Sequence, residues 1–165
     1  MGVQEVTLQP VYNLFIGGEF VPSVSGKVFA TINPANQEKL ADIAAAEAED
    51  VDRAVSAAWD AFPVWANMPP RERAGVLCAI ADAIDQNADF LATVETLDNG
   101  KPLEESLLDV GDTADQFRYF AACLRSDEGA FIAYDQNSFS LLIREPLGVV
   151  AQIIPWNFPL SISAW

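Results

Sequence analysis

The stretch that decides the expected fold is GVVAQIIPWNFP, residues 148–159. Its first half, from Gly148 to Ile154, is an almost unbroken apolar run rich in β-branched residues, which predicts a parallel strand covered on both faces. Pro155 ends that strand, and the LSISAW that follows the loop is predicted to begin the next helix. In an open α/β sheet, ligands bind outside the carboxyl ends of the strands. The PWNFP loop is therefore where we expect a cofactor to bind.

Four amphipathic helices are expected before this strand, after a small hairpin over residues 13–32 whose turn is Gly17-Gly18. Apolar side chains recur at helical spacing in each of the four segments. Asn87 is expected to cap the third helix, and Asn99-Gly100 to end it in a left-handed terminus. The four segments are 49–62, from Pro70 to about residue 84, 87–97, and 103 to about residue 125.

A different pattern follows the helices. Apolar residues at 139, 141 and 143 alternate with Ser140, Leu142 and Arg144, which predicts a strand with one buried face that ends at Pro146. Residues 148–154 are then the one stretch that reads as a strand buried on both faces.

Charge and the rare residue types exclude several functions. Nine Lys and Arg face 24 Asp and Glu, a formal net charge of −15, so nucleic acids and anionic membranes would be repelled. The absence of His removes Ser-His, Cys-His and His-metal catalysis from what these residues could do alone. Cys78 and Cys123 fall in helical stretches, where packing is the expected role, and the absence of CxxC favours a reducing cytoplasm. No apolar run approaches the roughly 18 residues that cross a bilayer.

Three motifs occur together: TINPA at 31–35, ETLDNGKP at 95–102 and EPLGVVAQIIPWNFPL at 145–160. Through them, nearly the whole chain resembles the aldehyde dehydrogenase superfamily. The resemblance implies an α/β fold with a doubly wound cofactor-binding domain, a catalytic domain and a small oligomerisation ribbon. It would assign residues 1–127 to the N-terminal part of the cofactor-binding domain, 128–146 to one ribbon arm, and 147–165 to the first strand of the dinucleotide-binding sheet with its PWNFP loop, the catalytic domain being absent from this chain.

The same resemblance implies an oxidoreductase. The parent protein would oxidise an aldehyde to a carboxylic acid with NAD or NADP, through a thiohemiacetal, hydride transfer and thioester hydrolysis. The motifs are most similar to those of members that act on small aliphatic aldehydes such as acetaldehyde. A homo-oligomer, either a dimer or a tetramer, is also expected for the parent enzyme.

By this resemblance, Ile153, Ile154, Pro155, Trp156 and Asn157 contact the cofactor, the first four through shape complementarity. Asn157 would also donate its side-chain amide to the aldehyde oxygen as that oxygen becomes an alkoxide. Core packing is the alternative for the isoleucines, and for Ile153 the two roles are equally expected. For Asn157 the alternative is a turn amide bonded to its own backbone.

A monovalent cation is implied as well. Main-chain oxygens near Thr31 and Ile32 and the carboxylate of Asp98 would hold it, and hard cations prefer such oxygen ligands. The alternative is that Asp98 joins Asn99-Gly100 in ending the helix.

The family's cysteine nucleophile, its glutamate general base and its lysine for the cofactor ribose are expected on segments beyond Trp165. Neither G-x-x-x-x-G-K nor G-x-G-x-x-G occurs to bind phosphates. The chain alone is therefore expected to be inactive. An alternative function is a truncated, non-catalytic module that pairs with full-length subunits through its ribbon strand.

Overall fold

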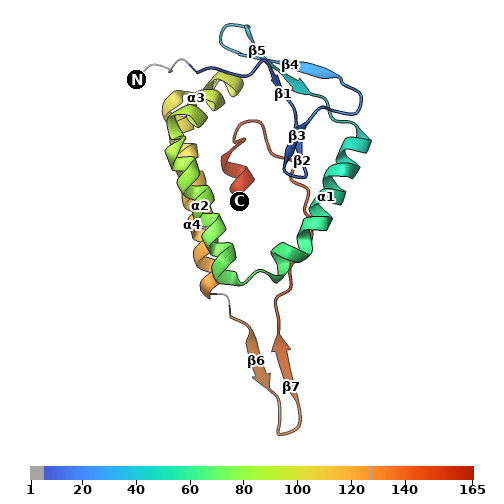
Figure 1. The fold of residues 1–165 in the computed structure, drawn as a ribbon. Coiled ribbons are helices and arrows are strands. Elements are labelled where there is room, and N and C mark those ends of the chain that lie inside the picture. The colour runs from blue at the N-terminus through green and yellow to red at the C-terminus, as the bar shows by residue number, and fades with distance from the viewer. Residues whose placement is uncertain (1–5, 127) are drawn as a thin grey trace.

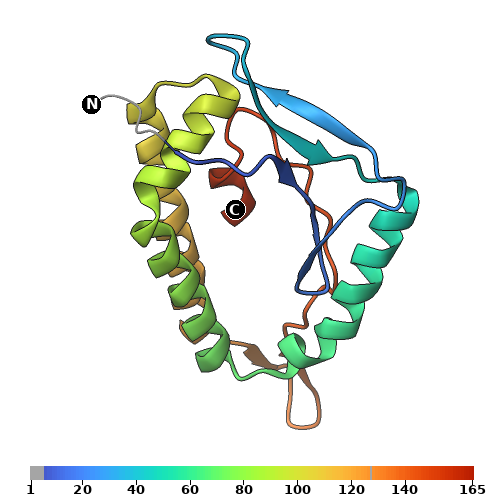
Figure 2. The ribbon, with the colours of Figure 1, turned by 45° about the horizontal axis from the view of Figure 1, so that its top comes forward.

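The computed structural model describes residues 6–126 and 128–165, which form an open frame of helices and short strands (Figure 1). Helices α2 and α4 make one side of the frame, α1 makes the other, and a small sheet lies across the end that carries α3. A hairpin projects from the opposite end, and the C-terminal turn lies inside the frame in both views (Figures 1 and 2). The strands are β1 (Val11–Tyr12), β2 (Leu14–Ile16), β3 (Glu19–Val21), β4 (Val28–Ile32), β5 (Lys39–Ala44), β6 (Ala130–Ala133) and β7 (Phe139–Leu142). The helices are α1 (Ala48–Asn67), α2 (Pro70–Gln86), α3 (Ala88–Asn99), α4 (Leu103–Ser126) and the 3₁₀ helix η1 (Ser161–Ala164).

The N-terminal strands form two small sheets. Strands β2 and β3 make the predicted hairpin, with positive φ angles at Gly17 and Gly18 and the Phe15 and Phe20 rings 5.1 Å apart. Strand β4, which also falls within residues 13–32, pairs instead with β5, and β5 pairs with β1 in parallel. Neither β1 nor β5 was predicted from the sequence. Strand β5 reads KLADIA, in which Ile43 is the one β-branched residue and no residue is aromatic, a composition that is weak for a strand.

Helix α1 is longer than predicted and begins in a capping box. The Glu47 side chain accepts from the main chain of Asp50, and the Asp50 carboxylate accepts the Glu47 N–H. Asp50 is almost fully buried and also accepts the Val24 N–H, at 3.0 Å. This one carboxylate therefore joins the start of α1 to the loop after β3.

Helices α2, α3 and α4 enclose the main core. Its fully buried members are small, which lets the helix backbones approach closely. Cys78, predicted to pack on the apolar stripe of α2, is exposed. The buried face of α2 runs through residues 74, 81 and 84, and position 78 lies beyond its edge. The core cluster is Ala81, Ile84, Ala92, Val110 and Ala114, with Leu160 of the C-terminal segment packed against it.

The ends of α3 follow the prediction only in part. Asn87 stands at the N-cap position, but its side chain donates to the Ala83 carbonyl at 2.8 Å and does not cap α3. The predicted capping bond is therefore wrong. Gly100 ends α3 in the left-handed conformation, with φ at +82° and its N–H bonded to the Thr96 carbonyl, as predicted.

The β6–β7 hairpin projects away from the frame (Figure 1). The prediction of a strand over 139–144 with one buried face is wrong in two respects. Strand β7 ends at Leu142, and both of its faces are largely exposed. The two paired strands form a single layer, and a second layer packed on it would be needed to bury either face.

Residues 148–154 form no strand in this chain, against the prediction. None of the strands described within 6–126 and 128–165 pairs with this segment. A parallel strand exists through hydrogen bonds to its neighbours, so the apolar run stays unpaired, with Ile153 98% exposed and Val150 66% exposed. The LSISAW segment likewise forms only the short 3₁₀ helix η1 instead of the predicted α-helix.

The turn at Gly100 generates a stability prediction. A Cβ at this position would lie 2.8 Å from Cγ of Pro34 as well as force a left-handed backbone onto an L side chain. Gly100→Ala should lower the free energy of unfolding of the purified protein by about 1–2 kcal/mol or more. Denaturant unfolding measures the change.

Gly111 is the matched control, because it lies inside α4 and a Cβ added there would meet open space. Gly111→Ala should raise the free energy of unfolding by about 0.5–1 kcal/mol, because alanine loses less backbone entropy than glycine in a helix. Equal effects of the two substitutions would contradict the assigned turn.

Candidate functional site

The PWNFP loop lies against α4 through the residues that follow it. Leu160 packs on the helical core, and Ser161 and Ala164 are buried. Main-chain hydrogen bonds close the loop, from the Phe158 N–H to the Pro155 carbonyl at 3.3 Å and from the Ile162 N–H to the Phe158 carbonyl at 3.2 Å. The loop is thus anchored at its C-terminal end, next to Asn157.

Of the five residues predicted to contact a cofactor, two precede the loop and three belong to it. Ile153, Pro155, Trp156 and Asn157 are exposed, and Ile154 is half-buried. The core-packing alternative for Ile153 is not what this chain shows. Trp156 is 78% exposed, which leaves its ring available for contact.

The Asn157 side chain makes no hydrogen bond to any residue within 6–126 or 128–165. The alternative of a turn amide bonded to its own backbone is therefore not what the structure shows. A free amide at the surface of an anchored loop can donate to an oxygen of a bound molecule.

A buried ion network lies directly beneath the loop. The ammonium of Lys101 contacts the carboxylate of Glu95 at 2.8 Å and also that of Asp109, and all three side chains are 13% exposed or less. The same ammonium lies 4.5 Å from the centroid of the Phe158 ring. This network was not predicted from the sequence. The signal was a lysine just after a helix end, with a carboxylate on each of the two helices it joins.

Burial and pairing change the acid–base properties of this network. Burial raises the pKa of Glu95, and the hydrogen bond and charge of Lys101 offset that rise only in part. For Lys101, burial favours the neutral amine, but hydrogen bonds to Asp109 and Glu95 outweigh it and raise the pKa. Lys101 is therefore a permanent cation at neutral pH.

The two other motifs meet at a second place. The Thr31 hydroxyl on β4 donates to the Asp98 carboxylate on α3, although the two residues are 67 positions apart. At the end of the same helix, the Asn99 side chain accepts from the Lys101 N–H at 2.9 Å. Thr31 and Asp98 line an apolar pocket of about 330 Å³, and Ile32 is not among its lining residues. The described residues contain no cluster of three or more His, Cys, Asp or Glu that could hold a metal.

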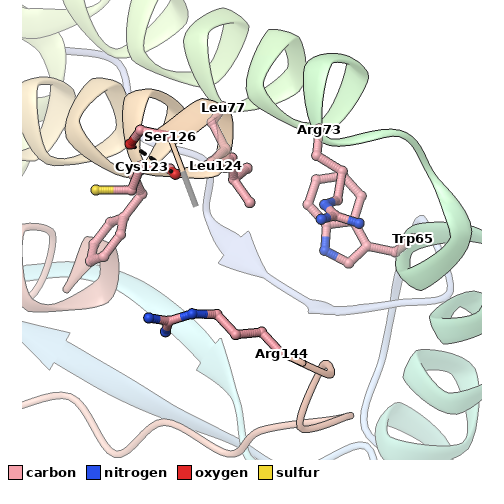
Figure 3. A pocket seen from close by; sticks show the side chains of 8 residues that line it. Trp65, Arg73, Leu77, Cys123, Leu124, Ser126 and Arg144 are labelled. Carbon is pink, nitrogen blue, oxygen red and sulfur yellow. Dashed lines mark hydrogen bonds between the residues drawn. The ribbon is translucent and has the colours of Figure 1, made fainter. Parts of the chain in front are cut away.

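A larger hollow of about 570 Å³ lies at the hairpin end of the frame, away from the motifs (Figure 3). The Arg73 guanidinium in it donates to the carbonyls of Ala66 and Met68, and Ser126 donates to helix carbonyls. These side chains satisfy the ends of helices, so the hollow is a weaker candidate site than the loop.

The comparisons with known proteins agree on one family. A model of the aldehyde dehydrogenase family matches residues 20–165. The chain belongs to this family. It is 47% identical over 161 residues to an acetaldehyde dehydrogenase of Pseudomonas aeruginosa and 44% identical over 161 residues to a fluoroacetaldehyde dehydrogenase of Streptantibioticus cattleyicolor. Both matches cover 97% of this chain and 32% of the relative, so the chain spans about a third of the length of these aldehyde dehydrogenases.

Solved aldehyde dehydrogenase structures share the fold. PnpE in complex with nicotinamide adenine dinucleotide matches with a TM-score of 0.89 at 42% identity, over 93% of this chain and 32% of that one. The P. syringae AldA indole-3-acetaldehyde dehydrogenase, a mutant in complex with NAD⁺, matches with a TM-score of 0.92 at 35% identity, over 99% and 33%. The resemblance and the α/β fold class inferred from the motifs are confirmed. None of the helices described within 6–126 and 128–165 combines the length and the apolar composition of a membrane span.

Proposed function

We propose that this chain supplies the N-terminal third of an enzyme that oxidises small aliphatic aldehydes to carboxylic acids with NAD or NADP. The observation that carries the proposal is the anchored PWNFP loop, which presents the Asn157 amide without a protein partner among the described residues. The relatives named for acetaldehyde and fluoroacetaldehyde support a small aliphatic substrate. Cytoplasmic location agrees with two unpaired cysteines.

For the cofactor, the segment from Ile153 to Trp156 offers exposed apolar surface directly before Asn157. Such a surface fits the ribose and nicotinamide side of a dinucleotide, which is recognised mostly through shape. The solved relatives that contain NAD⁺ support this choice. The cofactor, when bound, accepts the hydride, and these residues orient it and exclude water.

For the reaction, Asn157 would hold the aldehyde. Its amide N–H donates to the carbonyl oxygen and stabilises the negative charge that develops there when a thiol adds. The thiol, the general base and the ribose-binding lysine are the parts that the family supplies on other segments. Cys78 and Cys123 lie on α2 and α4, not on the loop, so we assign neither to this step.

Substituting Asn157 tests the oxyanion role. In the purified enzyme, Asn157→Ala should lower kcat by about a hundredfold to a thousandfold, since one preformed donor to the oxyanion is lost. The thermal unfolding midpoint should stay unchanged, because the side chain is exposed. Steady-state kinetics with acetaldehyde measure the effect. The control is Asn137→Ala, an exposed asparagine in the turn of the β6–β7 hairpin, which should keep full activity. A kcat within twofold of wild type for Asn157→Ala would remove this role.

A monovalent cation is proposed at Thr31, Ile32 and Asp98. The β4–β5 ladder shifts register between Thr31 and Ile32, which can free main-chain oxygens there, and Asp98 brings a carboxylate to the same place. Such oxygens suit a hard cation.

Asp98→Asn tests the cation site. Potassium or sodium should raise the thermal unfolding midpoint of the wild-type protein above that in tetramethylammonium of equal ionic strength, and Asp98→Asn should abolish the difference. Asp112→Asn, an exposed carboxylate on α4, is the matched control and should keep it. An ion-specific shift that survives in Asp98→Asn would exclude this site.

The second candidate function is a non-catalytic module that adds its ribbon strand to full-length subunits. It is favoured by the exposed apolar side chains of the β6–β7 hairpin, including Phe131, Phe139 and Leu141. In the enzyme, the same hairpin would join subunits into a dimer or tetramer.

The intact mass of the polypeptide in its source separates these two functions. A mass near 17.9 kDa supports the module. A mass about three times larger, as the 32% coverage of the relatives implies, supports the enzyme. Mass spectrometry of the purified native protein gives the answer.

A further inference from the structure

Lys101 connects the helical core to the PWNFP loop. It follows the left-handed Gly100 directly, so its backbone is fixed by the turn between α3 and α4. Its ammonium is held from both sides, by Glu95 on α3 and by Asp109 on α4. A flexible side chain has thereby become a point charge with a set position.

The remaining face of this ammonium is turned to Phe158. The distance of 4.5 Å from the nitrogen to the ring centroid lies within the range of a cation–π contact. The Lys101 side chain is only 11% exposed, which limits the screening of its charge by water, whereas the Phe158 ring is 42% exposed and is covered on the side of the ammonium. The ring is therefore held by an electrostatic contact from the core, not only by apolar packing.

Phe158 is the immediate neighbour of the proposed oxyanion donor. Its N–H and carbonyl both take part in the loop's hydrogen bonds, and Pro155 and Pro159 restrict the backbone on either side. Fixing Phe158 restrains the main chain that carries the neighbouring Asn157. A displacement of about 1 Å in a catalytic group can cost about a hundredfold in rate.

We propose that Lys101 is a positioning residue that acts through the Phe158 ring to orient the Asn157 amide. This inference rests on the proposed function. It assigns a catalytic consequence to the GKP part of the ETLDNGKP motif, more than fifty positions before the loop it serves.

The test is a double-mutant cycle in the purified enzyme. Phe158→Leu removes the ring but keeps apolar volume, and Phe158→Tyr keeps the ring. Lys101→Met removes the charge, and Lys101→Arg keeps it. Each is made in the wild-type enzyme and in Asn157→Ala. We expect Phe158→Leu and Lys101→Met to lower kcat about tenfold, with the KM for the dinucleotide nearly unchanged, and both conservative variants to retain activity.

In the Asn157→Ala background, Phe158→Leu and Lys101→Met should have almost no further effect, because the group they orient is gone. Hydrogen exchange of a peptide covering residues 153–160 gives a readout independent of turnover. It should quicken in Lys101→Met and Phe158→Leu, and stay as in wild type for Lys101→Arg. If Lys101→Met does not fold, the Phe158 pair decides alone.

Two results would overturn the inference. Equal losses of kcat in both backgrounds mean that Lys101 and Phe158 act on something other than Asn157, while the oxyanion role stands. Full activity in Phe158→Leu means that the ring orients nothing. Failure of the proposed function has its own signature, namely Asn157→Ala without loss of kcat, and the positioning role then falls with it.

Discussion

Two carboxylates, one on α3 and one on α4, lie buried on either side of the Lys101 ammonium. Removing one partner from such a buried arrangement typically costs about 3–5 kcal/mol, because charges are left without compensation. That is a large share of the roughly 5–15 kcal/mol by which domains are stable. The interaction joins α3 to α4, together with the apolar core that the two helices share. The C-terminal loop is linked to the same region, because η1 packs on α4.

The apolar run from Leu147 to Ile154 contrasts with that core. Leu147, Val150 and Ile153 are 95%, 66% and 98% exposed, although their composition is that of a buried strand. Burying a side chain of this kind contributes about 1.5–3 kcal/mol. The composition of this segment therefore suits a strand whose apolar side chains are buried, with a neighbouring strand on each side. The relatives, which are about three times longer, have the chain length for such a sheet.

Helices were predictable here because their signals are local. Apolar spacing located all four, and Gly100 located the end of α3, since a left-handed residue is needed there. Strands β1 and β5 were not predictable in the same way, because they are defined by partners far along the chain and β5 has weak strand composition. The exposure of Cys78 depends on which face of α2 packs against the other helices, and the bond of Asn87 to Ala83 depends on the geometry of the junction between α2 and α3. Neither is a local property of the sequence. For the site, the resemblance named the loop and the pair at Thr31 and Asp98. The charge beneath the loop was visible only once α3 and α4 lay together.

The contrast between a covered core and an uncovered apolar run has a consequence for synthesis. Contacts within residues 6–126 join residues at modest sequence separations. Val24 and Asp50 are 26 positions apart, and Thr31 and Asp98, a more distant pair, are 67 positions apart. Domains begin to fold from the N-terminus while the ribosome is still adding residues. The helical frame can therefore assemble first, and the run from Leu147 to Ile154 emerges behind it with no strand to join. During that interval the nascent chain exposes a short apolar segment. Chaperones bind segments of this kind, and nascent chains can aggregate through them.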